Sequence, residues 1–213
     1  MHNARGVDEV LLVIDVQNDF MPGGALAVAH GDEIVPVIEG IASAFRHVVL
    51  TQDWHPAAHV SFAANHAHRV PFEKIELPYG EQVLWPSHCV QDTPGAALHR
   101  GLCETAVRAR AVIRKGQHVD VDSYSAFVEA DRVTPTGLAG YLRELGVKRV
   151  WCCGLATDFC VAWSALDARA AGFDVSVIED ASRAIDLNGS LDAAWRDLHA
   201  AGIARVQAAD ALR

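Results

Sequence analysis

Short runs of aliphatic residues alternate with amphipathic segments along most of this chain. The first run, residues 10–14, is continuous and rich in branched side chains, which is typical of a strand covered on both faces in a parallel sheet. Similar runs predict further strands at residues 47–51, 109–115, 148–153 and 174–179, and a short edge strand at 204–207. Helical spacing, capping residues and glycine or proline stops predict helices at residues 31–46, 134–145, 158–171 and 190–201.

The alternation of strands and helices continues through the whole chain, with no internal repeat and no clear linker. It predicts an α/β fold: a single doubly wound, three-layer α/β/α domain over residues 1–213, built around a mainly parallel sheet of roughly six strands. One segment departs from the pattern. From about residue 53 to 95 the chain is rich in His, Pro and Gly and lacks periodicity, so we expect a loop excursion beside the sheet.

Composition narrows the class of partner. The chain has 213 residues, is 51% hydrophobic and carries a formal net charge of −9, which argues against nucleic acid or an anionic membrane surface as the main partner. Its five cysteines show no framework spacing, as expected in a reducing compartment, and no apolar leader or membrane-length run is present. We therefore expect a cytoplasmic protein. Whether it forms a homo-oligomer is left open.

Three reactive side chains stand at or just past predicted strand ends. Asp15 and Lys115 end two of the strands, and Cys160 falls in the first turn of the helix after residues 148–153, where Gly154 is expected to break the strand and Thr157 or Asp158 to cap the helix. Free N–H groups and the helix dipole favour a thiolate at such a position. Each residue alone has an ordinary explanation, as a turn aspartate, an exposed lysine or a small buried cysteine. Because ligand sites of open α/β sheets lie at the strand carboxyl ends, their coincidence favours catalysis.

A second set of residues has the chemistry of metal ligands. Asp53 and His55 are two apart in an extended segment, so both side chains can reach one ion, and His88 lies in a constrained loop further on. Two histidines and one carboxylate leave open positions on zinc, iron or manganese. An Asp-x-His pair also arises by chance in surface loops, and a purely structural zinc site is a further alternative. His59 lies nearby but is not included in the expected ligand set.

Together these segments resemble the isochorismatase-like cysteine hydrolase family, whose motifs occur here in family order over nearly the whole chain. The matching motifs are Val-Ile-Asp-Val-Gln-Asn-Asp-Phe at 13–20, Pro-Gly-Gly at 22–24, Thr-Gln-Asp-Trp-His at 51–55, Trp-Pro-Ser-His-Cys at 85–89, Arg-Lys-Gly at 114–116 and Gly-Leu-Ala-Thr-Asp-Phe-Cys at 154–160. The resemblance implies an Asp-Lys-Cys triad at Asp15, Lys115 and Cys160. Many members lack the metal set, so its presence narrows the resemblance to the nicotinamidase and pyrazinamidase branch.

That resemblance implies a metal-dependent cysteine amidohydrolase that converts nicotinamide to nicotinic acid and ammonia through a thioester, a step of NAD salvage. It places one divalent metal ion on Asp53, His55 and His88, with zinc expected first and iron or manganese as alternatives. It also implies an oxyanion hole made by the backbone N–H groups of Ala156 and Cys160, reached through a cis peptide between Leu155 and Ala156. Further residues match the wall that stacks on the substrate ring, with core packing as their alternative role: Phe20, Trp85 and Tyr124.

Two other functions stay open at this stage. The chain could be another amide or enol-ether hydrolase of the same family, which would not need a metal to anchor a pyridine ring. It could also be a non-catalytic member that binds a metal or a partner, although an intact triad argues against that alternative.

Overall fold

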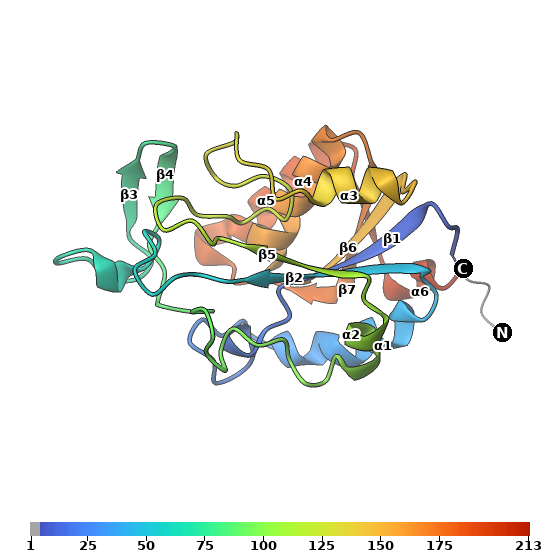
Figure 1. The fold of residues 1–213 in the computed structure, drawn as a ribbon, viewed down its shortest axis with the longest axis horizontal. Helices are drawn as coiled ribbons and strands as arrows, with labels where there is room; N and C mark the ends of the chain where they lie inside the picture. Colours follow the sequence, from blue (N-terminus) through green and yellow to red (C-terminus); the bar gives the residue numbers. More distant parts are fainter. Residues whose placement is uncertain (1–4) are drawn as a thin grey trace.

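A six-stranded parallel sheet forms the centre of the computed structural model, which describes residues 5–213 (Figure 1). Its strand order is β5-β2-β1-β6-β7-β8, and every neighbouring pair is parallel. The bounds are β1 (Glu9–Ile14), β2 (His47–Asp53), β5 (Ala111–Lys115), β6 (Arg149–Leu155), β7 (Asp174–Arg183) and β8 (Ala204–Val206). The order reverses beside β1, so the predicted doubly wound α/β sheet is confirmed.

Helices cover both faces of this sheet, as Figure 1 shows. One face carries α1 (Ile34–Ala42), α2 (Cys103–Arg108) and α6 (Ala208–Ala211), and the other carries α3 (Leu138–Glu144), α4 (Ala162–Ala170) and α5 (Ser190–Ala200). Each face has its own apolar core. Alternate residues of β1 enter the two cores, Leu11 on one side and Leu12 on the other, which is why this strand is apolar at successive positions.

Strand β6 continues through the glycine that was expected to end it. Gly154 lies inside β6 with φ +122°, and a Cβ atom built there would lie 2.1 Å from the carbonyl oxygen of Ile14. The glycine therefore allows close approach of β1 and β6, and the predicted break at Gly154 was wrong. Strand β7 is also longer than predicted and runs to Arg183, beyond a register irregularity between β6 and β7.

The helix that was expected to start at residue 134 starts at Leu138. Residues 134–136 instead pair with an earlier segment: Glu129 N–H donates to the carbonyl of Thr134 at 2.9 Å, and Thr136 N–H donates to that of Phe127 at 3.0 Å. Thr134 is therefore held in an extended bridge and does not cap the helix. The helix expected over 31–46 is shorter, with a 3₁₀ turn at Gly31–Glu33 before α1.

The excursion from residue 53 to 95 contains a hairpin that was not predicted. Strands β3 (Lys74–Leu77) and β4 (Gly80–Val83) pair antiparallel and project from the sheet's end (Figure 1). Strand β3 (Lys-Ile-Glu-Leu) alternates polar and apolar residues over only four positions, and β4 (Gly-Glu-Gln-Val) does not, so the signal is short. Among the residues of both strands only Gln82 is buried. The short helices α2 and α6 were also missed.

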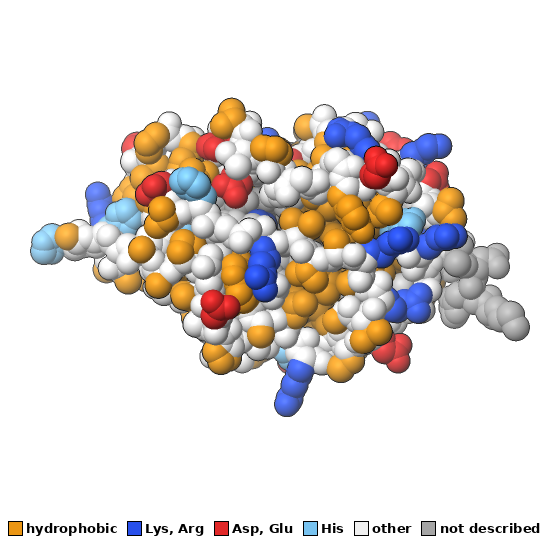
Figure 2. Space-filling view, viewed as in Figure 1, with side chains coloured by type: hydrophobic (Ala, Val, Ile, Leu, Met, Phe, Trp, Pro, Cys, Tyr) orange, Lys and Arg blue, Asp and Glu red, His pale blue; other side chains and the backbone are white. Residues whose placement is uncertain are grey.

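Charged side chains of both signs lie on the surface of the protein. Figure 2 shows acidic and basic side chains interspersed among apolar and uncharged ones on the face in view. Within residues 5–213, no helix combines the length and the apolar character needed to cross a bilayer.

Candidate active site

Three strand ends converge on one buried cluster. Asp15 follows β1 directly, Lys115 is the last residue of β5, and Cys160 lies in a π-helical turn, Thr157–Val161, after β6. Asp15 and Lys115 are fully buried and Cys160 is 6% exposed. Because β2 stands between β1 and β5, the lysine side chain has to reach across the end of β2 to meet the other two residues.

Lys115 is the centre of this cluster. Its Nζ lies 2.9 Å from Asp15 Oδ2 and 3.4 Å from Cys160 Sγ, and it donates to the carbonyl oxygen of Ser123 at 2.9 Å. It also forms an ion pair with Asp53, the residue opposite it on β2. One buried ammonium group therefore pairs with two buried carboxylates. Burial alone would lower the pKa of this ammonium, but the two aspartates outweigh it and raise that pKa well above its usual range.

Asp15 has the electrostatics of a general base. Burial raises the pKa of this carboxyl to about 6, against the opposing attraction of Lys115. Burial also raises the pKa of the Cys160 thiol well above its usual value, and the lowering effect of Lys115 does not compensate. The thiolate expected from the helix start is therefore not the resting form. A thiol stands beside a carboxylate that can take its proton.

Asp158 does not cap the helix that carries the cysteine. Its carboxylate accepts hydrogen bonds from the backbone N–H groups of Ile185 and Asp186 at 3.0 and 2.8 Å, and from Ser190 Oγ at 2.5 Å. The residue before the turn is Ala156, and no side chain caps the turn. Asp158 thus ties the segment before α5 to the turn that holds Cys160.

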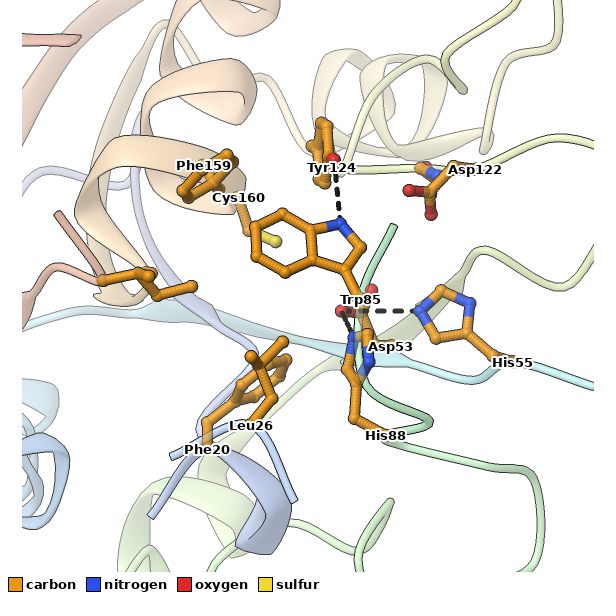
Figure 3. Close-up of a pocket in the computed structure, with 13 residues that line it drawn as sticks. Phe20, Leu26, Asp53, His55, Trp85, His88, Asp122, Tyr124, Phe159 and Cys160 are labelled. Atoms are coloured by element: carbon orange, nitrogen blue, oxygen red, sulfur yellow. Dashed lines mark hydrogen bonds and ion pairs between the residues drawn. The ribbon is translucent and has the colours of Figure 1, made fainter. Parts of the chain in front are cut away.

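Asp53, His55 and His88 meet at the other end of the pocket (Figure 3). Asp53 Oδ2 lies 3.7 Å from His55 Nε2 and 3.9 Å from His88 Nε2. Each histidine uses its Nδ1 on a backbone carbonyl, that of Gly116 at 2.9 Å and that of Pro86 at 2.8 Å. The two Nε2 atoms are thereby left to face the carboxylate, the arrangement by which backbone carbonyls orient metal-binding histidines.

These three residues fit a divalent metal ion. Their ligand atoms all lie within 4.8 Å of one another, and all three side chains are buried. Two imidazoles and one carboxylate suit zinc, iron or manganese and leave positions open for other ligands. The triple is therefore a candidate metal site whose occupant its residues alone do not specify.

His59 lies against His55, with ring centroids 4.2 Å apart. Both of its nitrogens have partners: Nδ1 lies 2.7 Å from Ser61 Oγ, and Nε2 lies 3.3 Å from the carbonyl oxygen of Val121. His55, His59 and Asp122 form another group of close potential ligand atoms. Asp122 was not singled out from the sequence, and its place in a polar, aromatic loop was the one available signal.

One pocket joins the two groups. The three aromatic residues predicted for its wall, Phe20, Trp85 and Tyr124, all line it. Trp85 Nε1 donates to the Tyr124 hydroxyl at 2.9 Å, drawn as a dashed line in Figure 3, and fixes the two rings edge to face. Leu26, a weaker candidate for the same wall, also lines the pocket. Four further lining residues were not assigned to it from the sequence: Asp122, Ser123, Phe159 and Ile185.

The cysteine end of the pocket is formed by Ala156 and Cys160. The peptide bond between Leu155 and Ala156 is cis, as the family resemblance implied. The pocket runs from the Cys160 thiol to Asp53, His55 and His88.

The isochorismatase domain model matches residues 9–210. The chain belongs to the isochorismatase family. A nicotinamidase of Acinetobacter baylyi is 55% identical over 202 residues, which cover 95% of this chain and 94% of that protein. Two solved structures are also similar to this member of the isochorismatase family.

The first is a nicotinamidase and pyrazinamidase of Acinetobacter baumanii, with a TM-score of 0.94, 56% identity, and coverage of 97% of this chain and 99% of the other. The second is a pyrazinamidase of Pyrococcus horikoshii in complex with zinc, with a TM-score of 0.76, 38% identity, and coverage of 94% and 99%. The isochorismatase fold therefore extends over almost the full length of the chain.

Proposed function

We propose that this protein hydrolyses nicotinamide to nicotinic acid and ammonia, a step of NAD salvage, through a thioester on Cys160. The observation that carries the proposal is the combination of a buried Asp-Lys-Cys cluster and a candidate metal site at opposite ends of one aromatic-lined pocket. The similarity to nicotinamidases over nearly the whole chain supports the same substrate. A flat pyridine amide suits a pocket walled by Phe20, Trp85 and Tyr124.

In the first half of the reaction, Asp15 accepts the proton of the Cys160 thiol and the sulfur attacks the carboxamide carbon. Backbone N–H groups of Ala156 and Cys160 stabilise the negative oxygen of the tetrahedral intermediate. The protonated Asp15 then gives its proton to the leaving nitrogen, so that ammonia departs and the thioester remains. Lys115 stabilises the ionised form of Asp15 before the first proton transfer, because its ammonium contacts Oδ2.

In the second half, Asp15 takes a proton from a water molecule that attacks the thioester carbon. Collapse of the new tetrahedral intermediate breaks the carbon–sulfur bond, releases nicotinic acid and returns the proton to the sulfur. The same carboxyl therefore acts as base and acid in both halves, for which a pKa near 6 is well matched to neutral pH.

Asp53, His55 and His88 would hold one divalent metal ion, and we propose zinc, with iron and manganese as alternatives. The zinc complex of the Pyrococcus horikoshii pyrazinamidase supports this choice. A cation held there would supply a Lewis-acidic point for a pyridine nitrogen and would so orient the ring. Trp85 and Phe20 exclude water from the ring faces.

We also propose that the whole chain acts as one domain in the cytoplasm. The family match over residues 9–210 supports a single unit. The cysteines support a reducing compartment, since all five are free.

Ammonia release from nicotinamide by the purified, zinc-loaded protein tests the proposal. We expect turnover by the wild type, its loss in Cys160→Ala, and unchanged turnover in Cys103→Ala, because Cys103 is exposed on α2, which contributes no residue to the pocket. Isochorismate and ureidoacrylate are run in parallel as family substrates. Their hydrolysis without turnover of nicotinamide would contradict the proposed substrate while leaving the cysteine mechanism in place.

A further inference from the structure

Thr51 makes two hydrogen bonds to Asp15 at the point where β1 ends. Its Oγ1 lies 3.1 Å from the Asp15 backbone nitrogen and 2.5 Å from Asp15 Oδ1, and the side chain is fully buried. Asp15 has a φ of +50°, in the left-handed region that residues other than glycine rarely adopt. The hydroxyl thus holds both the backbone and the carboxyl of the residue that carries the base.

The direction of these bonds follows from the donors available. The backbone N–H of Asp15 can only donate, so the Thr51 oxygen accepts there, and its single proton is left for Asp15 Oδ1. Asp15 Oδ2, in contrast, makes an ion pair with Lys115 at 2.9 Å and no hydrogen bond of good geometry within residues 5–213. The two carboxylate oxygens therefore have different environments.

We propose that Thr51 is a positioning residue for Asp15. Its hydroxyl donates a hydrogen bond to Oδ1, so that Oδ2 is the oxygen that accepts the proton of the Cys160 thiol. Potential ligand atoms of Asp15 and Cys160 lie within 4.8 Å of each other, and Lys115 contacts both side chains. A carboxylate free to rotate would present either oxygen, and it would also lose the contact that holds its backbone. This inference rests on the proposed function, because it assigns the geometry of the proposed base.

The position of Thr51 predicts which kinetic constant it affects. Thr51 does not line the pocket, and its hydroxyl is fully engaged with Asp15. Its loss should therefore leave nicotinamide binding unchanged and slow the proton transfers. A general packing defect would not separate kcat from KM in this way.

The test compares Thr51→Val, which keeps the shape and suits a strand, with Thr51→Ser, which keeps the hydroxyl. We expect Thr51→Val to lose about 10- to 100-fold in kcat, the effect of losing a hydrogen bond to a charged group, with KM within about twofold of wild type. Thr51→Ser should recover most of the loss. Thr51→Ala replaces the valine variant if that variant does not fold.

Thr105 provides a matched control. It is also fully buried, but its hydroxyl has no hydrogen-bond partner in the described chain, so Thr105→Val should leave kcat and KM unchanged. The proposal is overturned if Thr51→Val keeps wild-type kcat, if the loss lies in KM, or if Thr51→Ser loses as much as Thr51→Val.

A second readout separates this proposal from the proposed function. The rate of Cys160 alkylation by iodoacetamide, followed by peptide mass spectrometry with exposed Cys103 as internal reference, reports thiol activation without any substrate. If wild type does not hydrolyse nicotinamide, the proposed function fails, and slower Cys160 alkylation in Thr51→Val than in Thr51→Ser still supports the positioning role. Equal alkylation rates in those two variants would overturn it.

Discussion

The two ends of the pocket are built in different ways. At the cysteine end, Asp15 and Lys115 stand at the ends of sheet strands and Cys160 in the turn that follows a third. At the metal-ligand end, only Asp53 belongs to a strand, and the two histidines lie in loops where backbone carbonyls fix their rings. The sheet strands therefore position Asp15, Lys115 and the turn that holds Cys160, and loop contacts position His55 and His88. The first end should tolerate changes in the excursion better than the second.

One ion-pair network joins the two ends. Lys115 contacts Asp15 on the cysteine side and Asp53 on the metal side, while Asp53 directs its other oxygen toward His55 and His88. Burial alone would raise the pKa of Asp53, but attraction to Lys115 and His55 outweighs it and lowers that pKa below its usual range. Asp53 is therefore ionised both in its ion pair with Lys115 and where it faces the two histidines.

Replacing Lys115 should have the largest effect on stability and turnover, because it removes the ion pairs at both ends of the pocket at once. Lys115→Met leaves two buried carboxylates without their cation, and breaking a buried ion pair in this way lowers the free energy of unfolding by about 3–5 kcal/mol. Turnover should fall below detection. Urea unfolding followed by circular dichroism measures the stability, and added zinc should restore part of it because Asp53 regains a cation.

Lys148→Met is the matched control. Lys148 is exposed, and its Nζ lies 4.0 Å from Asp8, so its loss should change stability by less than about 1 kcal/mol. Wild-type stability in Lys115→Met would show that the two ends are not coupled through this lysine.

The sequence was sufficient for the cysteine end and insufficient for the link between the ends. The apolar run of β1 predicted a buried strand, and Asp15 at its end could be placed at the sheet's carboxyl edge. The contact of Lys115 with Asp53 depends on β5 lying next to β2, and strand order is not contained in the periodicity of either strand. The ion pair between the ends therefore required the structure.

The geometry of the loops also could not be predicted from the sequence. Gln82 of β4 donates to Asp122 Oδ2 at 2.7 Å and thereby connects the hairpin to the pocket wall. The hairpin gave only a weak strand signal, because the polar-apolar alternation is limited to the four residues of β3 and only Gln82 is buried. The family motifs located His88 without its orientation, which depends on a carbonyl two residues before it.

Removing His88, an expected ligand in a loop, should have the next largest effect on activity. This effect should be confined to the metal-ligand end. His88→Ala deletes one of three expected ligands, so zinc affinity should fall at least about 10- to 100-fold, the loss typical of removing even an outer partner of a ligand. KM for nicotinamide should rise more than kcat falls, since Cys160 and Asp15 are unchanged. Zinc titration with a fluorescent indicator and steady-state kinetics measure the two effects.

His30→Ala is the control, because His30 is exposed and pairs only with Glu33. The chelated wild type should keep its circular dichroism spectrum, since His55 and His88 lie outside the strands of the sheet. Unfolding on chelation would instead identify a structural zinc site. Unaltered zinc affinity in His88→Ala would remove this histidine from the ligand set.

Acid should produce the smallest effect, and titration of Asp15 at the cysteine end is its expected cause. Asp15 must be ionised to take the thiol proton, and its pKa is raised to about 6, so kcat/KM should fall as the pH drops through 6, by about tenfold for each further unit. Asp53 stays ionised over this range, and burial first, then His55, lowers the pKa of His88 to about 4. Burial would lower the pKa of His55, but Asp53 outweighs it and raises that pKa, so metal loss through His55 must be measured separately. Zinc measured at each pH excludes metal loss as the cause. A flat profile from pH 7 to 5 would mean that Lys115 outweighs burial at Asp15, and the cysteine end would then owe its acid–base chemistry to the ion pair more than to the desolvation imposed by the sheet.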